Sequence, residues 1–195
     1  MTPAASGDFA GRLARALAAR APVRVERPEA RLAAVAVVIT SGADPAILFI
    51  RRKERVGDPW SGQMAFPGGF TSAGDPSLEA TARRETEEET GIALEGSALL
   101  GVLDDVSPRT PYLPPLVVTP YVFRVERELA ARPGPEAEET VWLRVRDLFD
   151  RALRRPFRLA LPRENREFES IVVGGYTIWG LTERVLHQLG ATAPP

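Results

Sequence analysis

The segment from Phe66 to Ile92 constrains this chain more than any other, because a Pro-Gly-Gly turn and a cluster of glutamates lie within one short stretch. Residues 78–90 contain neither glycine nor proline, and Gly91 suits the end of a helix. The segment therefore predicts a helix from Pro76 to Thr90, with Asp75 as its N-cap and a proline in the first turn.

Three glutamates of this helix, Glu85, Glu88 and Glu89, stand at positions i, i+3 and i+4 and share one face. Like charges at these spacings repel by roughly 0.2–0.5 kcal/mol per pair, and anions near a helix C-terminus oppose its dipole by roughly 0.3–1 kcal/mol each. Arg83 and Arg84 neutralise part of this charge. Converging carboxylates are also the hard oxygen ligands that Mg²⁺ or Mn²⁺ prefer. We interpret the face as a divalent metal site, with a solvated acidic face as the alternative.

The same segment resembles the Nudix box, G-x5-E-x7-R-E-U-x-E-E-x-G-U, in which U is a bulky apolar residue. Its second half is matched by the run from Arg84 to Ile92, with Thr86 in an apolar position. In the first half the glycine falls on Gly69 and the first acid on Asp75, and eight residues rather than seven separate that acid from Arg84. On these residues the chain is identified as a member of the Nudix family.

The resemblance implies an α/β (α+β) fold, with a mixed β-sheet sandwiched between helices and the box as a loop-helix-loop unit. It also implies hydrolysis of a diphosphate linked to another moiety, with Mg²⁺ or Mn²⁺ as cofactor, and a homodimer. By position it assigns a carbonyl metal ligand to Gly69, direct metal contacts to Glu85 and Glu89, and a direct or water-mediated contact to Glu88. Arg84 would orient the glutamates, and Asp75 would give structural support.

Charged residues on either side of the box are further candidates. Arg51, Arg52, Lys53 and Arg55 precede the glycine loop and are candidates for phosphate or ribose contacts, with a solvated strand end as the alternative. Gly68 allows the backbone to approach a metal or phosphate closely. The resemblance also implies a catalytic glutamate from a loop outside the box.

The best source of that glutamate is the acidic loop that contains Glu136, Glu138 and Glu139, and Glu139 lies nearest the following strand.

Within the family, the run from Gly62 to Gly69 resembles the G-x3-F-P-G-G end of the motif of coenzyme A diphosphatases, and Trp179–Thr182 resembles a segment near the end of those enzymes. That motif has an arginine where this chain has Asp58, and its Leu-Leu-Thr-x-Arg run is approximated by Leu48–Arg52. The resemblance implies cleavage of coenzyme A or acyl-coenzyme A to 3′,5′-ADP and 4′-phosphopantetheine. The alternatives are ADP-ribose, NADH or dinucleoside polyphosphates, and, in another class, a ligand-sensing Nudix module without turnover.

The length and charge of the chain limit the number of domains and the kinds of binding partner. A chain of 195 residues, 44% hydrophobic and 26% charged, is long enough for one globular domain with a substantial core. We expect one domain over residues 1–195, with residues 1–30 as an N-terminal helical extension and linker. The net charge of −1 provides no bulk field that would recruit nucleic acid or an anionic membrane.

The residue types that are absent or rare narrow the chemistry. No cysteine is present, which excludes disulfides, thiolate metal sites and a cysteine nucleophile. His187 is the single histidine, and its distance in sequence from the acids predicts a surface or partly packed residue rather than a zinc ligand. No apolar run reaches the roughly 18 residues of a membrane span, and the N-terminus lacks the layout of a signal peptide. We therefore expect a cytoplasmic protein that uses carboxylates and metal.

The remaining pattern predicts the other elements from periodicity and from Gly and Pro positions. The proline-rich segment Ser107–Pro115 predicts a loop that shapes a site. The expected helices are Ser6–Arg20, Arg146–Leu153 and Thr177–Leu189, and the expected strands are Ala33–Thr40, Ala46–Arg51, Gln63–Phe66, Ala98–Leu103, Leu116–Val125 and Val141–Val145.

Overall fold

The computed structural model of this chain describes residues 8–58, 60–95, 97–108, 113–160 and 165–195. Residues 109–112 of the predicted proline-rich loop and the first residues of the predicted N-terminal helix lie outside these ranges. The elements, in chain order, are α1 (Phe9–Ala18), β1 (Arg31–Thr40), β2 (Ala46–Arg52), β3 (Met64–Ala65), β4 (Gly68–Phe70), α2 (Leu78–Thr90), β5 (Ala98–Val102), β6 (Leu116–Val125), β7 (Ala137–Arg144), α3 (Val145–Leu148), the 3-10 turn η1 (Arg151–Leu153), β8 (Arg154–Ala160), β9 (Asn165–Val173), β10 (Tyr176–Trp179) and α4 (Gly180–Thr192).

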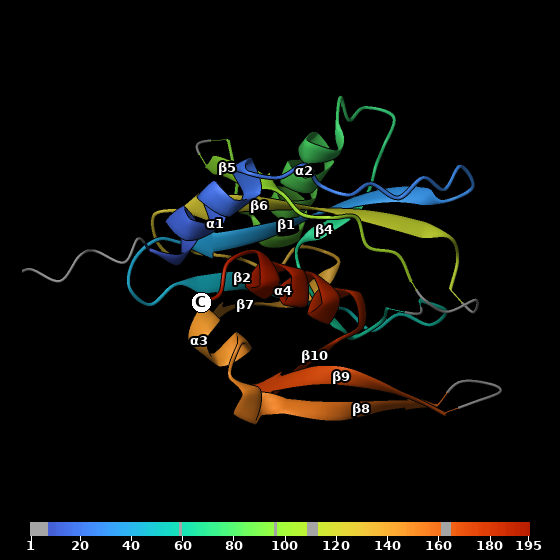
Figure 1. Cartoon of the computed structure of the whole chain (residues 1–195). Helices are drawn as coiled ribbons and strands as arrows, with labels where there is room; N and C mark the ends of the chain where they lie inside the picture. Colours follow the sequence, from blue (N-terminus) through green and yellow to red (C-terminus); the bar gives the residue numbers. More distant parts are fainter. Residues whose placement is uncertain (1–7, 59, 96, 109–112, 161–164) are drawn as a thin grey trace, which may run out of the picture.

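The strands form a larger mixed sheet and a smaller antiparallel one. The larger sheet has the order β3-β2-β1-β6-β5, while β4 also pairs with β1 and β7 also pairs with β2. β1 and β6 run parallel, and the other pairs are antiparallel. The smaller sheet has the order β10-β9-β8 and extends to one side of the larger sheet, at the bottom of Figure 1. The predicted mixed sheet is confirmed.

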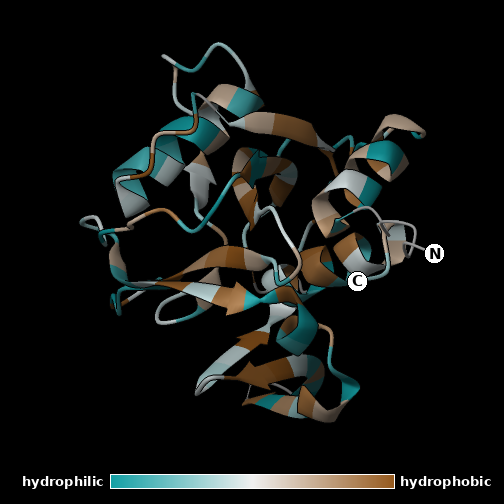
Figure 2. Ribbon diagram, turned by 90° about the vertical axis from the view of Figure 1, so that its left-hand side faces the viewer, coloured by the Kyte–Doolittle hydropathy of each residue, from teal (hydrophilic) through white to brown (hydrophobic). Residues whose placement is uncertain are grey.

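The central strand β1 shows why helices cover both faces of the larger sheet. Val37 and Ile39 are buried in a core that includes residues of α1 and α4, whereas Ala36 and Val38 are buried in a second core that includes Ala82 of α2. Successive side chains of a strand point to opposite faces, so an apolar residue at every position needs cover on both sides. Figure 2 shows hydrophobic strands between the helices, as predicted for this fold class.

The predicted N-terminal amphipathic helix is present as α1 and belongs to the core. The Asp8 side chain caps it by accepting a hydrogen bond of 2.6 Å from the backbone N–H of Gly11. Phe9, Leu13 and Leu17 are buried on one face, which contacts β5 and α4. The described segment 21–30 then leads to β1 without helix or strand.

The start of the box helix differs from the prediction. α2 begins at Leu78, and Ser77 is its N-cap, with the hydroxyl accepting a hydrogen bond from the backbone N–H of Ala80. The prediction of Asp75 as N-cap was wrong, because the carboxylate of Asp75 is occupied by Arg84. The predicted end at Thr90 is confirmed, and Gly91 adopts the left-handed conformation with φ of 69°.

Three boundaries in the second half of the chain also differ from the prediction. The strand predicted to start at Val141 begins at Ala137, because residues 137–144 pair with β2. The terminal helix begins at Gly180 rather than Thr177, because residues 177–179 pair with β9 in β10. The predicted helix over 146–153 is the short α3 followed by η1. Strand pairing has therefore replaced the predicted loop before Val141 and the predicted helical start at Thr177.

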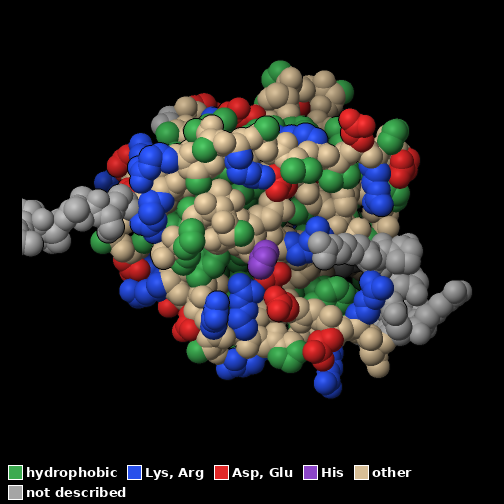
Figure 3. Space-filling model, in the orientation of Figure 1, with side chains coloured by type: hydrophobic (Ala, Val, Ile, Leu, Met, Phe, Trp, Pro, Cys, Tyr) green, Lys and Arg blue, Asp and Glu red, His purple; other side chains and the backbone are tan. Residues whose placement is uncertain are grey.

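No helix in the described part of the chain is long and apolar enough to cross a membrane. Basic and acidic side chains are intermixed over the face shown in Figure 3. His187, the purple side chain in Figure 3, is exposed on α4, so its prediction as a surface residue is confirmed.

Candidate active site

The glycine pair predicted as a turn lies on β4, directly beside β1. A Cβ added to Gly68 would lie 2.4 Å from the carbonyl oxygen of Ala34, so only glycine allows this strand pairing. A Cβ added to Gly69 would lie 2.5 Å from the carboxylate of Glu85. The missing side chain at Gly69 therefore lets a helix carboxylate rest directly against the strand backbone.

Arg84 connects the acidic residues at this end of α2. Its Nε and Nη2 atoms donate hydrogen bonds of 2.9 Å to the two carboxylate oxygens of Asp75. Its Nη1 atom donates to Glu85 at 2.8 Å and to Glu88 at 3.1 Å. These hydrogen bonds from Arg84 hold the pKa of Asp75 well below its usual range. The additional residue before Arg84 therefore does not prevent its contact with the first acid of the box.

Thr86 occupies the box position where a bulky apolar residue is usual, and it is completely buried. Its hydroxyl donates a hydrogen bond of 2.6 Å to the carbonyl oxygen of Ala82, one turn earlier in α2. The polar atom is thus satisfied within the helix. This local bond explains how threonine is accommodated here.

Glu89 is the most deeply buried of the box glutamates, with 2% of its surface exposed. Its Oε2 atom accepts a hydrogen bond of 2.9 Å from the backbone N–H of Gly68. Burial raises the pKa of Glu89 to about 7, although this hydrogen bond and the charge of Arg52 oppose the shift. A carboxylate in this environment is stabilised by a positive charge beside it.

Glu85 and Glu88 differ in environment. Burial raises the pKa of the half-buried Glu85, although Arg84 opposes the shift. The side chain of Glu88 is 58% exposed and lies against Arg84. Over the described ranges, no group of three or more Asp, Glu, His or Cys side chains is arranged to hold a metal ion. Because Nη1 of Arg84 binds Glu85 at 2.8 Å and Glu88 at 3.1 Å, these two carboxylates lie against one guanidinium, and the role of the three box glutamates as metal ligands stays a prediction.

The acidic segment after α2 divides into three environments. Glu136 lies in a turn, accepts a hydrogen bond of 3.1 Å from Arg55 and lines the cavity described below. Its charge contributes to the raised pKa values of Glu85 and Glu89. Glu138 and Glu139 lie on β7 rather than in the predicted loop, because residues 137–144 pair with β2.

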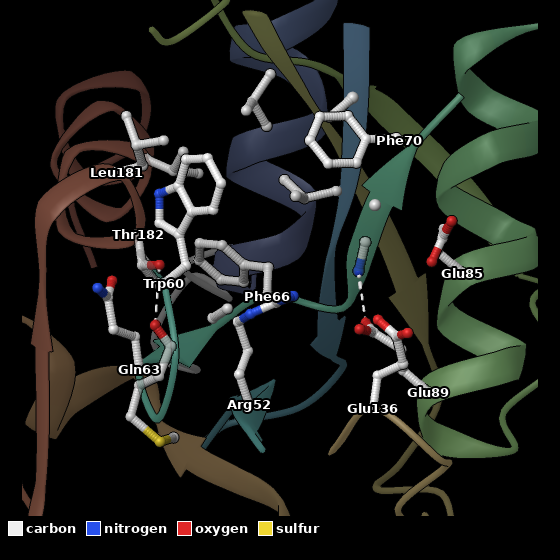
Figure 4. Close-up of a pocket in the computed structure, with 18 of the residues that line it drawn as sticks. Arg52, Trp60, Gln63, Phe66, Phe70, Glu85, Glu89, Glu136, Leu181 and Thr182 are labelled. Carbon is white, nitrogen blue, oxygen red and sulfur yellow. Dashed lines mark hydrogen bonds between the residues drawn. The ribbon is translucent and has the colours of Figure 1, made fainter. Parts of the chain in front are cut away.

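The two strand glutamates have partners of their own. Glu138 pairs with Arg51 at 2.8 Å, and Glu139 accepts a hydrogen bond from the hydroxyl of Tyr176. Glu139 is not among the described residues that line the cavity. Of the three acids, Glu136 is the one that the fold brings to Glu85 and Glu89 (Figure 4).

The four predicted substrate-binding bases are also separated by the fold. Arg52 lines the cavity and pairs with Asp58 at 3.0 Å. Arg51 pairs with Glu138 and Arg55 with Glu136, while Lys53 is exposed. The register between β2 and β7 shifts between Arg51 and Arg52, which gives these neighbours different partners.

The cavity has a volume of about 640 Å³ and connects the acidic end to an apolar end. Trp60 and Phe66 lie toward the apolar end, near Leu181 and Thr182 of α4 (Figure 4). Thr182 donates a hydrogen bond of 3.0 Å to the carbonyl oxygen of Met64, drawn as a dashed line in Figure 4. The remaining apolar lining comes from several elements: Ala33, Val35, Phe70, Val106, Leu116, Val118 and Val185.

Sequence reasoning missed most of this apolar lining. Residues such as Val35 and Val118 read as ordinary core positions, and no local pattern distinguishes a strand residue that faces a cavity from one that faces a packed core. Leu181 and Thr182 carried a signal, because they belong to the segment that resembles the C-terminal part of coenzyme A diphosphatases.

Comparison with known proteins gives the family. The family model described as the NUDIX domain matches residues 30–163. The chain belongs to the Nudix family. This Nudix hydrolase is 32% identical over 163 residues to NudL of Pectobacterium atrosepticum, described as an uncharacterized Nudix hydrolase, and the match covers 82% of this chain and 81% of the relative. NudL of Photorhabdus laumondii is 32% identical over 171 residues, covering 82% and 83% of the two chains.

Solved structures support the Nudix fold. The MutT/nudix family protein from Enterococcus faecalis superposes with a TM-score of 0.57 at 22% identity, covering 86% of this chain and 63% of that one. The MutT NUDIX hydrolase from Burkholderia pseudomallei gives a TM-score of 0.50 at 24% identity, covering 84% and 98%. At these identities the likeness establishes the fold alone.

Proposed function

We propose that this Nudix hydrolase cleaves the diphosphate of a nucleoside diphosphate derivative at the acidic end of the cavity. The observation that carries this proposal is the position of Glu85, Glu89 and Glu136 at one end of a cavity whose other end is apolar. A substrate with a charged diphosphate and a larger, less polar group matches both ends.

The residues at the acidic end fit a divalent cation. Glu85 rests against the backbone of Gly69, Glu89 is buried beside Gly68, and the available donors are all hard oxygens, which suit Mg²⁺ or Mn²⁺. We propose Glu85, Glu89 and the Gly69 carbonyl as ligands, with Glu88 contributing directly or through water. Such an ion supplies Lewis-acid polarisation of the phosphoryl oxygens.

The protein residues have separate tasks in this proposal. Arg84 orients Glu85 and Glu88 through its Nη1 atom, and Asp75 holds Arg84 from the other side. Glu136 accepts the proton of the water that attacks phosphorus, as the new O–P bond forms and the bridging P–O bond breaks. Glu139 is the alternative base, although its carboxylate is bound to Tyr176. No covalent intermediate is required.

Coenzyme A or an acyl derivative is the leading substrate, cleaved to 3′,5′-ADP and 4′-phosphopantetheine. The apolar end of the cavity supports this choice, because it suits the aliphatic part of such a molecule, and because Leu181 and Thr182 of the related C-terminal segment line it. ADP-ribose, NADH and dinucleoside polyphosphates are the alternatives, because Trp60 and Phe66 offer stacking to the adenine that all these compounds share with coenzyme A.

A side-by-side assay tests the proposal. Coenzyme A, dephospho-coenzyme A, ADP-ribose, NADH and diadenosine polyphosphates are incubated with the enzyme and Mg²⁺ or Mn²⁺, with a chelator control, and the products are identified. We expect metal-dependent cleavage, with coenzyme A compounds giving the highest kcat/KM. A much higher kcat/KM for ADP-ribose or NADH would reject the coenzyme A assignment. No turnover of any compound would favour the ligand-sensing module.

A further inference from the structure

Arg52 occupies a distinctive position between the two ends of the cavity. It is the single cationic side chain among the described residues that line the cavity, whereas four carboxylates line the same space. Figure 4 shows it between Glu89 and Glu136 on one side and Trp60 on the other. Any anionic group of a substrate that extends from the acidic end toward the apolar end therefore passes close to this guanidinium.

Asp58 already binds this guanidinium. Its Oδ2 atom accepts a hydrogen bond of 3.0 Å from Nη2 of Arg52, and its Oδ1 atom accepts one of 2.9 Å from the backbone N–H of Trp60. The two side chains are 24% and 18% exposed, so the pair is largely shielded from water. Asp58 thus connects the cation of the cavity to the loop that carries Trp60.

The donors of this guanidinium are partly engaged and partly buried. Nη2 is bound to Asp58, and Nε makes no hydrogen bond with any described residue but is buried, so a ligand in the cavity does not reach it in this conformation. A phosphate monoester carries a charge of about −1.5 to −2 and is bound best by paired guanidinium donors. It competes with Asp58 for the same cation.

We propose that Asp58 is a specificity-determining residue, which pairs with Arg52 and thereby lowers the affinity of the cavity for compounds that carry a phosphate monoester. This inference rests on the proposed function, since it concerns selection among substrates of the same cavity. Asp58 stands where the coenzyme A diphosphatase motif has an arginine, and the proposal states what this difference does to substrate binding.

The decisive variant is Asp58→Asn, which removes the charge but keeps an oxygen for the N–H of Trp60. Two matched pairs of compounds differ only by a phosphate monoester: coenzyme A against dephospho-coenzyme A, and NADPH against NADH. Binding of 3′,5′-ADP against AMP, measured by titration calorimetry, gives a readout that does not require turnover. Asp44→Asn is the control, because Asp44 pairs with Arg146 at 3.2 Å and does not line the cavity.

We expect Asp58→Asn to raise the preference for the phosphate-bearing member by about five- to twentyfold, in the kcat/KM ratio and in the ratio of Kd values, because a charged hydrogen-bond partner is removed from a partly exposed arginine. Asp44→Asn should leave both ratios within about twofold. In an Arg52→Gln background, Asp58→Asn should no longer change them.

The outcomes separate this inference from the proposed function. The role of Asp58 would be overturned if the kcat/KM and Kd ratios were the same in wild type and Asp58→Asn. It would also be overturned if Asp58→Asn changed these ratios equally in the Arg52→Gln background, or if neither 3′,5′-ADP nor AMP bound. Selective binding that responds to Asp58→Asn, without turnover of any compound, would support that role and overturn the proposed hydrolysis instead.

Discussion

The backbone N–H of Gly68 donates a hydrogen bond of 2.9 Å to Oε2 of Glu89, which joins the box helix to the strand that it covers. The carboxylate is buried, and the charge of Glu85 adds to the cost of ionising it. A group held in this way contributes little to the stability of the folded chain when ionised. We propose that this position serves the binding of a cation.

The first prediction concerns turnover. Glu89→Gln should lower kcat by at least about 100-fold, because it removes a proposed metal ligand while its amide oxygen can still accept from Gly68. Glu87→Gln, an exposed change on the same helix, is the control and should retain nearly full activity. Steady-state kinetics over a range of Mg²⁺ concentrations measures the effect. Unchanged Mg²⁺-dependent activity of Glu89→Gln would refute the ligand assignment.

The second prediction concerns stability against pH in the presence of a chelator. The pKa of Glu89 is about 7 in the folded chain against 4.5 ordinarily, so the folded state binds this proton more tightly than the unfolded state. The free energy of unfolding should therefore decrease as pH rises from about 4.5 to 7 and level off above that.

The same linkage fixes the behaviour of the variant. Glu89→Gln lacks this titration, so it should match or exceed wild type at pH 8, by on the order of 1–3 kcal/mol, and lose the advantage near pH 4.5. Urea unfolding at several pH values measures the difference. A wild-type advantage at pH 8 would contradict the raised pKa.

The third prediction identifies the base. Glu136→Gln should lower kcat by about 10²–10⁴-fold, because Glu136 lies in the cavity with Glu85 and Glu89. Glu138→Gln and Glu139→Gln should retain kcat within about threefold, since those side chains bind Arg51 and Tyr176 on β7. If all three variants keep kcat within about threefold, the base is a box glutamate or a metal-bound hydroxide.

The fourth prediction contrasts the two glycines of β4. Gly68→Ala should destabilise the fold, because its Cβ would lie 2.4 Å from a backbone oxygen that cannot move away without separating β4 from β1. Gly69→Ala should cost little stability, because the atoms nearest its Cβ belong to the movable carboxylate of Glu85. It should nevertheless lower activity, since Glu85 is displaced. Thermal unfolding and steady-state kinetics of both variants test this contrast. An equal decrease in Tm for Gly68→Ala and Gly69→Ala would contradict it.

Local sequence determined where several helices and strands lie and what chemistry the box can support. Gly91 specified the end of the box helix, because a glycine tolerates the left-handed conformation that closes a helix. Apolar residues at every position from Leu32 to Ile39 specified a strand covered on both faces. The glutamates of the box specified hard oxygen ligands, because this property belongs to the carboxylate group itself and not to its contacts. Each of these properties depends on residues that are close in the chain.

Only the tertiary structure decided which distant side chains share the site. Glu136 and Glu139 are three positions apart and equally acidic in sequence, yet the pairing of β7 with β2 separates them, with one in the cavity and the other on Tyr176. The same holds for Arg52, whose partner Asp58 lies in a following loop. These outcomes depend on long-range strand register and on competition among oppositely charged partners, and neither is encoded in any local pattern.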